Sequence, residues 1–285
     1  MSDHYKWRKI KKNDIDSARG MLACIEDNYV SACAKFLNCE ISKDPIWILS
    51  SKEEKFAGFV INSKSTILPV FRGRKEIPNP DFLKGLMRAK LIHSVQGLKD
   101  EVQILEGLIE KTGRLPADII DYDLMNLKKI PEGGGGKSKL PDCPNLVLRT
   151  PGMTDVDEMT PLQAAYELEE VIPKGSSFNP AASRVNIANL IAGGRILAAE
   201  VDGRLVGKIN VNAVSFTRYQ VGGVYVEPKY RGRGIAKKMA AQFITSLIND
   251  GKGVTLFVKK TNDAARRLYS GLGFSKSKDY RITYY

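Results

Sequence analysis

The feature that most constrains this chain is a strand, a basic glycine-containing loop and a helix that follow one another directly in residues 221–250. VGGVYVEP is typical of a strand, KYRGRG of a tight loop and IAKKMAAQFITSLIND of a helix. Gly232 and Gly234 let the backbone turn sharply without Cβ atoms, so several N–H groups can converge on one anion. The helix N-terminus adds unsatisfied donors and a partial positive charge. We therefore predict a pyrophosphate-binding loop, to which four side chains add charge: Arg231, Arg233, Lys237 and Lys238.

A dinucleotide-binding loop is not supported. The third glycine of that fingerprint is missing. Asp250, about twenty residues on, falls at the end of the predicted helix and not on a second strand, so no acidic partner for a ribose is evident. A bare Gly-x-Gly also serves many turns for purely conformational reasons, so the loop needs a second signal.

The second signal is the segment TNDAARRLYSGLGF, which follows a predicted strand at residues 254–258. At helical spacing, one face carries Asn262, Ala265, Arg266 and Tyr269. Taken singly, Asn262 is typical of a helix cap, Gly271 or Gly273 of a helix stop, and Tyr269 of a core aromatic.

Together the two segments resemble the GNAT superfamily of acyl-CoA-dependent N-acyltransferases. Arg231 to Ala236 matches its Arg/Gln-x-x-Gly-x-Gly/Ala loop, and Asn262 to Phe274 matches its Asn-x-x-Ala-x-x-x-Tyr…Gly-Phe helix. The resemblance covers roughly residues 145–285 and implies acetyl-CoA (coenzyme A) as the cofactor. It implies these cofactor-binding residues: Val224, Val226, Arg231, Gly232, Arg233, Gly234, Ile235, Ala236 and Asn262.

The resemblance also implies a mechanism. Backbone groups of Val224 and Val226 would contact the pantetheine and polarise the thioester carbonyl, an amine would attack directly, and Tyr269 would protonate the departing thiolate. Gly222-Gly223 just before them fits a bulge, a close backbone approach or a bent strand.

The general base is not assigned. A glutamate that some relatives carry on the motif strand would fall near Gln220, which cannot accept a proton. The alternatives are a water chain or one of four carboxylates, each of which also fits a solvated helix, strand-end or turn position: Glu169, Glu170, Glu200 and Glu227.

The charge distribution agrees with an acidic cofactor. The 285 residues carry a formal charge of +12, and residues 201–285 hold sixteen Lys/Arg and five Asp/Glu, so almost all of the excess lies in the segment with both motifs. Local positive potential favours capture of a cofactor with three phosphates. Nucleic-acid binding is the competing interpretation, but the basic residues are dispersed among predicted core elements and no nucleic-acid-binding motif is present.

Other chemistry has little support. The four cysteines form no Cys-x-x-Cys pair and the two histidines, His4 and His93, are isolated, so no metal site and no Ser-His or Cys-His nucleophile is predicted. The charged N-terminus lacks an apolar leader and no run of about eighteen apolar residues occurs, so we expect a cytoplasmic protein without a membrane partner.

Residues 131–144 divide the chain. The stretch PEGGGGKSKLP is too rich in glycine for a helix or strand and indicates a flexible linker. It nearly spells a nucleotide-binding P-loop, but Pro131 replaces the first glycine and Pro141 prevents the helix that must follow.

After the linker, residues 145–285 show the order of a complete GNAT domain. Asp202-Gly203 predicts a hairpin between two of its strands. We predict strands at 146–149, 195–201, 205–211, 221–228, 254–258 and 280–285, and helices at 155–172, 181–191 and 235–250. The predicted fold class is α/β (α+β in some schemes): a GNAT fold, with a mixed, mostly antiparallel sheet flanked by helices.

Residues 1–130 show a weaker pattern of the same kind. The predicted elements are helices at 15–37, 81–87 and 98–109 and strands at 46–49, 56–62, 67–71 and 91–95. The last strand, a Gln96-Gly97 turn and the last helix echo the cofactor unit, yet Lys99 and Glu101 stand where the loop needs Gly and Gly/Ala. We therefore expect a degenerate GNAT-like domain that binds no cofactor and helps to shape the substrate site.

The sequence as a whole predicts an N-acetyltransferase that moves the acetyl group of acetyl-CoA to a primary amine of a small molecule or peptide, with Tyr269 as general acid. The alternative is a non-catalytic acyl-CoA-binding regulatory module that kept the loop and lost turnover. The acceptor amine cannot be read from the sequence.

Overall fold

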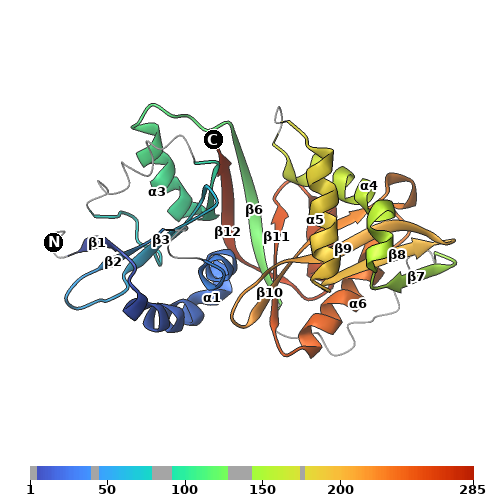
Figure 1. The fold of residues 1–285 in the computed structure, drawn as a ribbon, viewed down its shortest axis with the longest axis horizontal. Coiled ribbons are helices and arrows are strands. Elements are labelled where there is room, and N and C mark those ends of the chain that lie inside the picture. Colours follow the sequence, from blue (N-terminus) through green and yellow to red (C-terminus); the bar gives the residue numbers. More distant parts are fainter. Residues whose placement is uncertain (1–4, 40–44, 79–91, 128–142, 174–176) are drawn as a thin grey trace.

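One twelve-stranded sheet runs through the molecule (Figure 1). The structure is a computed structural model and describes residues 5–39, 45–78, 92–127, 143–173 and 177–285. The strand order is β1-β2-β3-β4-β5-β12-β6-β11-β10-β9-β8-β7. The strands are β1 (Lys6–Lys9), β2 (Ile46–Ser50), β3 (Gly58–Ser63), β4 (Thr66–Val70), β5 (Ser94–Leu98), β6 (Asp118–Leu127), β7 (Leu146–Arg149), β8 (Ile196–Val201), β9 (Arg204–Val214), β10 (Arg218–Val226), β11 (Gly253–Lys259) and β12 (Ser275–Tyr284).

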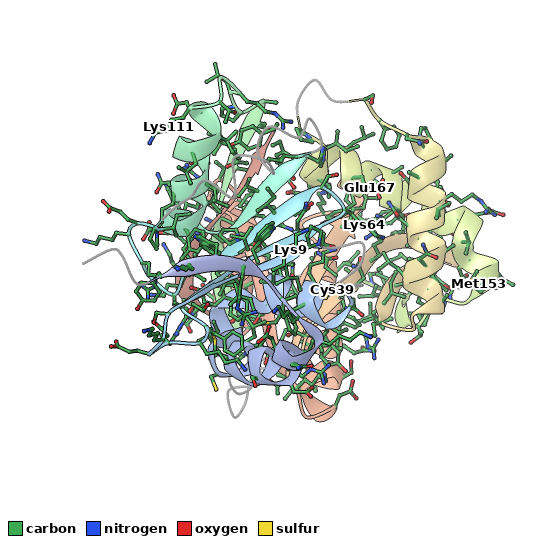
Figure 2. The ribbon with its side chains drawn as sticks, turned by 60° about the vertical axis from the view of Figure 1, so that its left-hand side comes forward. Lys9, Cys39, Lys64, Lys111, Met153 and Glu167 are labelled. Atoms are coloured by element: carbon green, nitrogen blue, oxygen red, sulfur yellow. The ribbon has the colours of Figure 1, made fainter. Side chains whose placement is uncertain are left out.

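Helices cover both faces of the sheet (Figures 1 and 2). They are α1 (Ile15–Leu37), α3 (Lys99–Glu110), α4 (Val156–Tyr166), α5 (Pro180–Ala192), α6 (Ile235–Asn249) and α7 (Asp263–Gly271), and a π-helical turn, Glu167–Val171, extends α4. Alternate strand residues serve the two faces, as the pleat requires. In β3, for example, Phe59 packs in the cluster that includes α1, and Val60 packs in the cluster that includes α3.

In the C-terminal half, the same alternation separates two cores. Ala198 of β8 packs with α4 and α5, whereas Ala199 packs with α6 on the other face. Helix α1 reaches across to this half and contacts β9 and β10. Two of its acids make this contact: Asp27 forms an ion pair with Arg218, and the buried Glu26 accepts a hydrogen bond from the N–H of Thr217 at 3.0 Å.

The two halves exchange strands at the middle of the sheet. β6, from the N-terminal half, lies between β11 and β12, and β12, from the end of the chain, lies between β5 and β6. Each half of the sheet is therefore completed by a strand of the other. Arg281 of β12 strengthens this junction, because its guanidinium binds both carboxylate oxygens of Asp121 of β6, at 2.7 and 3.1 Å.

Most predicted elements are confirmed. α1 and β7 have the predicted bounds, and Asp202 and Gly203 form the hairpin turn with positive φ values of 51° and 77°. The predicted turn at Gln96-Gly97 is wrong, because both residues lie within β5. Gly97 leaves room for the Pro69 side chain of the neighbouring strand, since a Cβ at Gly97 would lie 3.3 Å from that side chain. The predicted helix at 81–87 and nearly all of the predicted linker lie outside the described residues.

Candidate active site

Two parallel strands separate at the centre of the C-terminal half. The pairing of β10 with β11 runs only from Arg218 opposite Gly253 to Val221 opposite Leu256. On its other side, β10 pairs with β9 at Gly222 and again at Tyr225, so Gly223 and Val224 have no partner in this ladder. Of the alternatives for Gly222-Gly223, this register shift fits the bulge, and no residue of β9 or β11 stands opposite Val224.

The sequence Gly222-Gly223 is required by close packing beneath this bulge. A Cβ on Gly222 would lie 2.1 Å from Asn212 Nδ2, and one on Gly223 would lie 1.8 Å from Asn210 Oδ1. Gly223 also has a φ of 62°, a conformation that favours glycine. Larger residues would displace the amide side chains of Asn210 and Asn212 and the Lys208 Nζ that lie beneath the bulge.

A buried lysine, which the sequence analysis missed, supports the bulge from below. Lys208 of β9 is fully buried, and its Nζ donates hydrogen bonds to the carbonyl oxygen of Gly223 at 2.9 Å and to Asn210 Oδ1 at 3.0 Å. The Nζ also lies 4.4 Å from the centre of the Tyr166 ring. Burial lowers the pKa of Lys208 to about 7, against a partial opposing effect of Glu167. A lone Lys in a strand carries no sequence signal for this role.

The predicted phosphate loop ends in an open helix N-terminus. Gly232 and Gly234 have φ values of 78° and 75°, and Gly234 is the N-cap of α6. No side chain caps this helix, so its first N–H groups lack the partner that a Ser, Asp or Asn would supply. The uncapped donors that follow Gly234 could hold the phosphates of coenzyme A.

The arginines of the loop have structural contacts of their own. Arg231 donates to the carbonyl oxygen of Val226 at 2.8 Å and forms an ion pair with Glu169 at 2.7 Å. Its guanidinium thus joins the loop to the π-helical turn. The guanidinium of Arg233 lies 5.4 Å from the centre of the Tyr230 ring.

A cavity of about 590 Å³ lies where β10 and β11 separate. Six of the predicted site residues line it: Val224, Val226, Arg231, Ala236, Asn262 and Tyr269. The other four, Gly232, Arg233, Gly234 and Ile235, lie between Arg231 and Ala236 in the chain and are not among its lining residues. Asn262 Oδ1 accepts a hydrogen bond from the N–H of Ala265 at 3.0 Å, so its side chain caps α7.

Tyr269 is buried in the wall of this cavity. Its ring packs edge-on against Phe274, with centroids 5.8 Å apart, and its hydroxyl makes no hydrogen bond within the described part of the chain. Burial raises the pKa of Tyr269, and Tyr166 and Glu170 add smaller effects in the same direction. The hydroxyl therefore carries its proton at neutral pH.

Two of the four candidate carboxylates reach the cavity. Glu169 and Glu170 line it because the π-helical turn after α4 carries them there. Glu170 forms an ion pair with Lys259 at 3.0 Å. Glu200 instead pairs with Arg149 and Glu227 with Lys229, and neither lines the cavity.

Three strands at the middle of the sheet complete the same wall. Tyr122 of β6 and Gln96 of β5 come from the N-terminal half, and Tyr284 of β12 comes from the end of the chain. None of these residues was predicted, because nothing local in the sequence indicates that β6 of the first half stands between β11 and β12.

The described residues contain no group of three or more His, Cys, Asp or Glu side chains that could hold a metal ion. Across the same ranges, no helix has the length and apolar character needed to cross a membrane.

The comparisons with known proteins agree with this geometry. Residues 162–274 match the sequence model of the acetyltransferase (GNAT) family. The N-alpha-acetyltransferase RimI of Mycobacterium tuberculosis is 33% identical over 85 residues, which are 28% of this chain and 51% of that protein, so the match spans about half of the curated relative.

Solved structures match nearly the whole fold. A Drosophila protein has a TM-score of 0.67 at 13% identity and covers 98% of both chains. A GCN5-related N-acetyltransferase from Sphaerobacter thermophilus has a TM-score of 0.62 at 19% identity, over 99% of this chain and 95% of that one. These likenesses show the fold, including that of the N-terminal half. The family uses acetyl-CoA, in agreement with the predicted cofactor. Residues 162–274 thus belong to the acetyltransferase (GNAT) family, within a chain whose mixed sheet and flanking helices have the GNAT fold throughout.

Proposed function

We propose that the protein transfers the acetyl group of acetyl-CoA to an amine, with Tyr269 as the general acid. One observation carries the proposal. A single cavity joins the first turn of α6, at Ala236, to the unpaired backbone of Val224 and to Tyr269. The start of α6, the backbone of Val224 and the ring that carries the proton donor therefore border one space.

Each group has a role that follows from its surroundings. Acetyl-CoA supplies the activated acyl group as a thioester. The uncapped N–H groups from Gly232 to Ala236 bind its phosphates. The backbone N–H of Val224, which has no residue opposite it in β9 or β11, would stabilise the negative charge that develops on a carbonyl oxygen. Asn262 contributes indirectly, because its side chain fixes the start of the helix that carries Tyr269.

Tyr269 can donate its proton to a leaving thiolate despite its raised pKa. A phenol and a thiol both ionise from a neutral to an anionic form, so burial raises the pKa of both groups. The difference in pKa between the phenol and the thiol therefore stays largely unchanged inside the cavity that they share. A hydrogen bond from the hydroxyl stabilises the sulfur as its charge develops.

The phosphate loop offers a test with a matched pair of variants. Asp and Asn both tolerate the left-handed conformation of Gly234 and both cap helices well, so neither Gly234→Asp nor Gly234→Asn should unfold the protein. Only Asp places a negative charge at the phosphate site. By calorimetry, we expect Gly234→Asp to abolish acetyl-CoA binding and Gly234→Asn to weaken it less.

Turnover is measured with a panel of small-molecule and peptide amines that includes α-amino groups, the acceptor class named for the RimI relative. Acetylation of any amine supports the enzyme. Binding of acetyl-CoA without acetylation of any of them, and without residual hydrolysis, would favour the non-catalytic acyl-CoA-binding module. Absence of binding at millimolar acetyl-CoA would contradict both the enzyme and the non-catalytic acyl-CoA-binding module. A cytoplasmic location remains a prediction from the sequence.

A further inference from the structure

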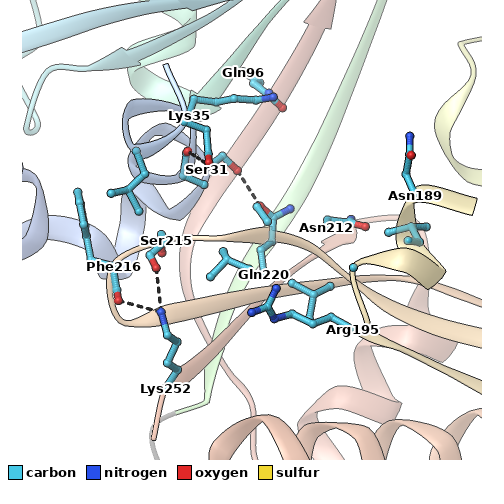
Figure 3. Close-up of a pocket in the computed structure, with 18 of the residues that line it drawn as sticks. Ser31, Lys35, Gln96, Asn189, Arg195, Asn212, Ser215, Phe216, Gln220 and Lys252 are labelled. Carbon is cyan, nitrogen blue, oxygen red and sulfur yellow. Dashed lines mark hydrogen bonds between the residues drawn. The ribbon is translucent and has the colours of Figure 1, made fainter. Parts of the chain in front are cut away.

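A second and larger cavity adjoins the first on the face of the sheet that carries α1 and α5. Its volume is about 1090 Å³, and its walls come from α1, the end of α5, β9 and the turn between β9 and β10 (Figure 3). We call it the α1–α5 groove. Three amide side chains line both cavities, so the two spaces meet at them: Gln96, Asn212 and Gln220.

The charged residues of this groove are all cationic. They are Arg19, Lys35, Arg195 and Lys252, and no carboxylate lines the groove. Lys252 Nζ donates to the carbonyl oxygens of Ser215 and Phe216 at 3.2 and 3.0 Å, as Figure 3 shows, and the guanidinium of Arg195 lies 5.6 Å from the centre of the Tyr219 ring.

These cations are not neutralised by acids of the described chain. Within residues 5–39, 45–78, 92–127, 143–173 and 177–285, none of the four forms an ion pair. The two acids of α1 that reach the turn between β9 and β10 have other partners, since Glu26 accepts hydrogen bonds from Ser215 and Thr217 and Asp27 pairs with Arg218. A groove with four unpaired cations and no acid has a positive potential that attracts anions.

The passage between the two cavities is polar and uncharged. The hydroxyl of Ser31, on α1, donates to Gln220 Oε1 at 2.9 Å, which fixes that amide and leaves its NH₂ group free to donate (Figure 3). Asn210 Nδ2 donates to Asn212 Oδ1 at 2.8 Å. Amides at this position can hydrogen-bond to a neutral amine without holding it as a cation.

We propose that the α1–α5 groove binds the acidic end of the acceptor, so that the substrate is an amine that also carries a carboxylate or phosphate. Its anionic group lies against the cations of the groove, and its amine passes Gln220 to reach the acetyl-CoA cavity. The amine nitrogen forms the new C–N bond, the C–S bond of the thioester breaks, and the displaced amine proton balances the thiol that leaves. This inference rests on the proposed acetyl transfer.

In this proposal, the N-terminal half helps to bind the acceptor. Arg19, Ser31 and Lys35 all belong to α1, so the first half supplies one wall of the acceptor site. The same positive charge disfavours acceptors with several amines, such as polyamines, because their remaining ammonium groups face like charges.

The test compares acceptors that differ only in the acidic group. The pairs are 6-aminohexanoate with hexylamine, and phosphoethanolamine with ethanolamine. We expect kcat/KM to be about tenfold higher for at least one acidic member, mainly through KM, because a charge-assisted contact in a half-buried groove contributes on that scale. The pair that shows the preference identifies carboxylate or phosphate. The preference should shrink as salt increases.

Variants then test whether the cations of the α1–α5 groove cause the preference for acidic acceptors. Lys35→Gln and Arg195→Gln should each lower kcat/KM for the acidic acceptor by about two- to fivefold and leave its neutral counterpart unchanged. Lys111→Gln is the matched control, because Lys111 lies at the end of α3 in the N-terminal half, outside both cavities (Figure 2). Equal kcat/KM within both pairs, or losses that are the same for acidic and neutral acceptors, would overturn the proposal.

Calorimetry separates this proposal from the proposed function. Each acidic amine is titrated into the protein without acetyl-CoA. Binding that Lys35→Gln weakens supports the groove even if no acetyl transfer is found, in which case the proposed function alone fails. Absence of acceptor binding in a protein that binds acetyl-CoA and acetylates neutral amines equally well would reject the groove alone.

Discussion

The carboxylate of Glu101 accepts a hydrogen bond from the backbone N–H of Gly73 at 3.2 Å, at the point where the N-terminal half has its counterpart of the phosphate loop. β4 and β5 are parallel neighbours, as β10 and β11 are. The segment that follows β4, with Gly73, therefore corresponds to the loop that follows β10. The counterpart predicted from the sequence, between β5 and α3, lies one strand too late.

Glu101 itself corresponds to a small residue in the C-terminal half. It is the third residue of α3, as Ala265 is the third residue of α7, and each helix follows the second strand of its parallel pair. Glu101 is buried and also accepts a hydrogen bond from the hydroxyl of Tyr29 at 2.6 Å. A built-in carboxylate thus lies against the donors that would otherwise meet a phosphate.

We accordingly predict one coenzyme A per chain. Calorimetric titration should give a stoichiometry of one for the natural protein. Gly234→Asp should reduce it to zero, because no second site remains in the N-terminal half. A stoichiometry of two, or one remaining site in Gly234→Asp, would show that Glu101 does not close the first half to the cofactor.

The buried Lys208 leads to a prediction about pH and stability. Its pKa is about 7 in the folded protein, below its ordinary value of 10.5, because burial disfavours the charged form. Between these values the unfolded chain binds a proton that the folded protein does not, so stability from this group rises as pH increases from 7 to about 10. Either protonation state can still donate to Gly223 and Asn210.

Urea unfolding at pH 7 and pH 9.5 measures this effect. The difference in free energy of unfolding between the natural protein and Lys208→Met should change in favour of lysine at the higher pH, by an amount on the order of a few kcal/mol. Lys111→Met, on the surface, serves as the control without such a slope. A difference that is the same at both pH values would mean that Lys208 is not desolvated in solution.

The parts of the site that were predictable are those that a continuous stretch of sequence specifies. The loop from Arg231 to Gly234 and the cap at Asn262 depend on glycine conformations and a capping side chain a few residues away, so their spacing is visible in the chain. β6 was missed for a physical reason. Its pattern is interrupted by acids, of which Asp123 is buried and tolerated only because Arg266 and Lys276, distant in sequence, neutralise it at 3.0 and 3.1 Å.

Tyr269→Phe tests the general acid. The ring packing against Phe274 is preserved, so stability and acetyl-CoA affinity should stay close to those of the natural protein. kcat with the best acceptor should fall by about a hundredfold, since only the hydroxyl is lost. Tyr285→Phe is a matched control, because Tyr285 is outside the cavity. A kcat ratio near one would leave Tyr269 with a packing role alone.

The strand exchange predicts that the halves do not fold separately. Residues 143–285 alone lack β6, so β11 and β12 each lose the strand that lies between them, and the cavity loses Tyr122. Residues 1–142 alone lack β12, which removes the strand between β5 and β6 and leaves Asp121 without Arg281. Each fragment would expose unpaired edges at the centre of a sheet, where buried apolar residues such as Leu124 and Leu256 would meet water.

We expect neither fragment alone to melt cooperatively or to bind acetyl-CoA. Co-expression of the two fragments should restore both properties, as measured by thermal denaturation and calorimetry. Cooperative melting and full acetyl-CoA affinity of residues 143–285 alone would show that the C-terminal half is a complete domain.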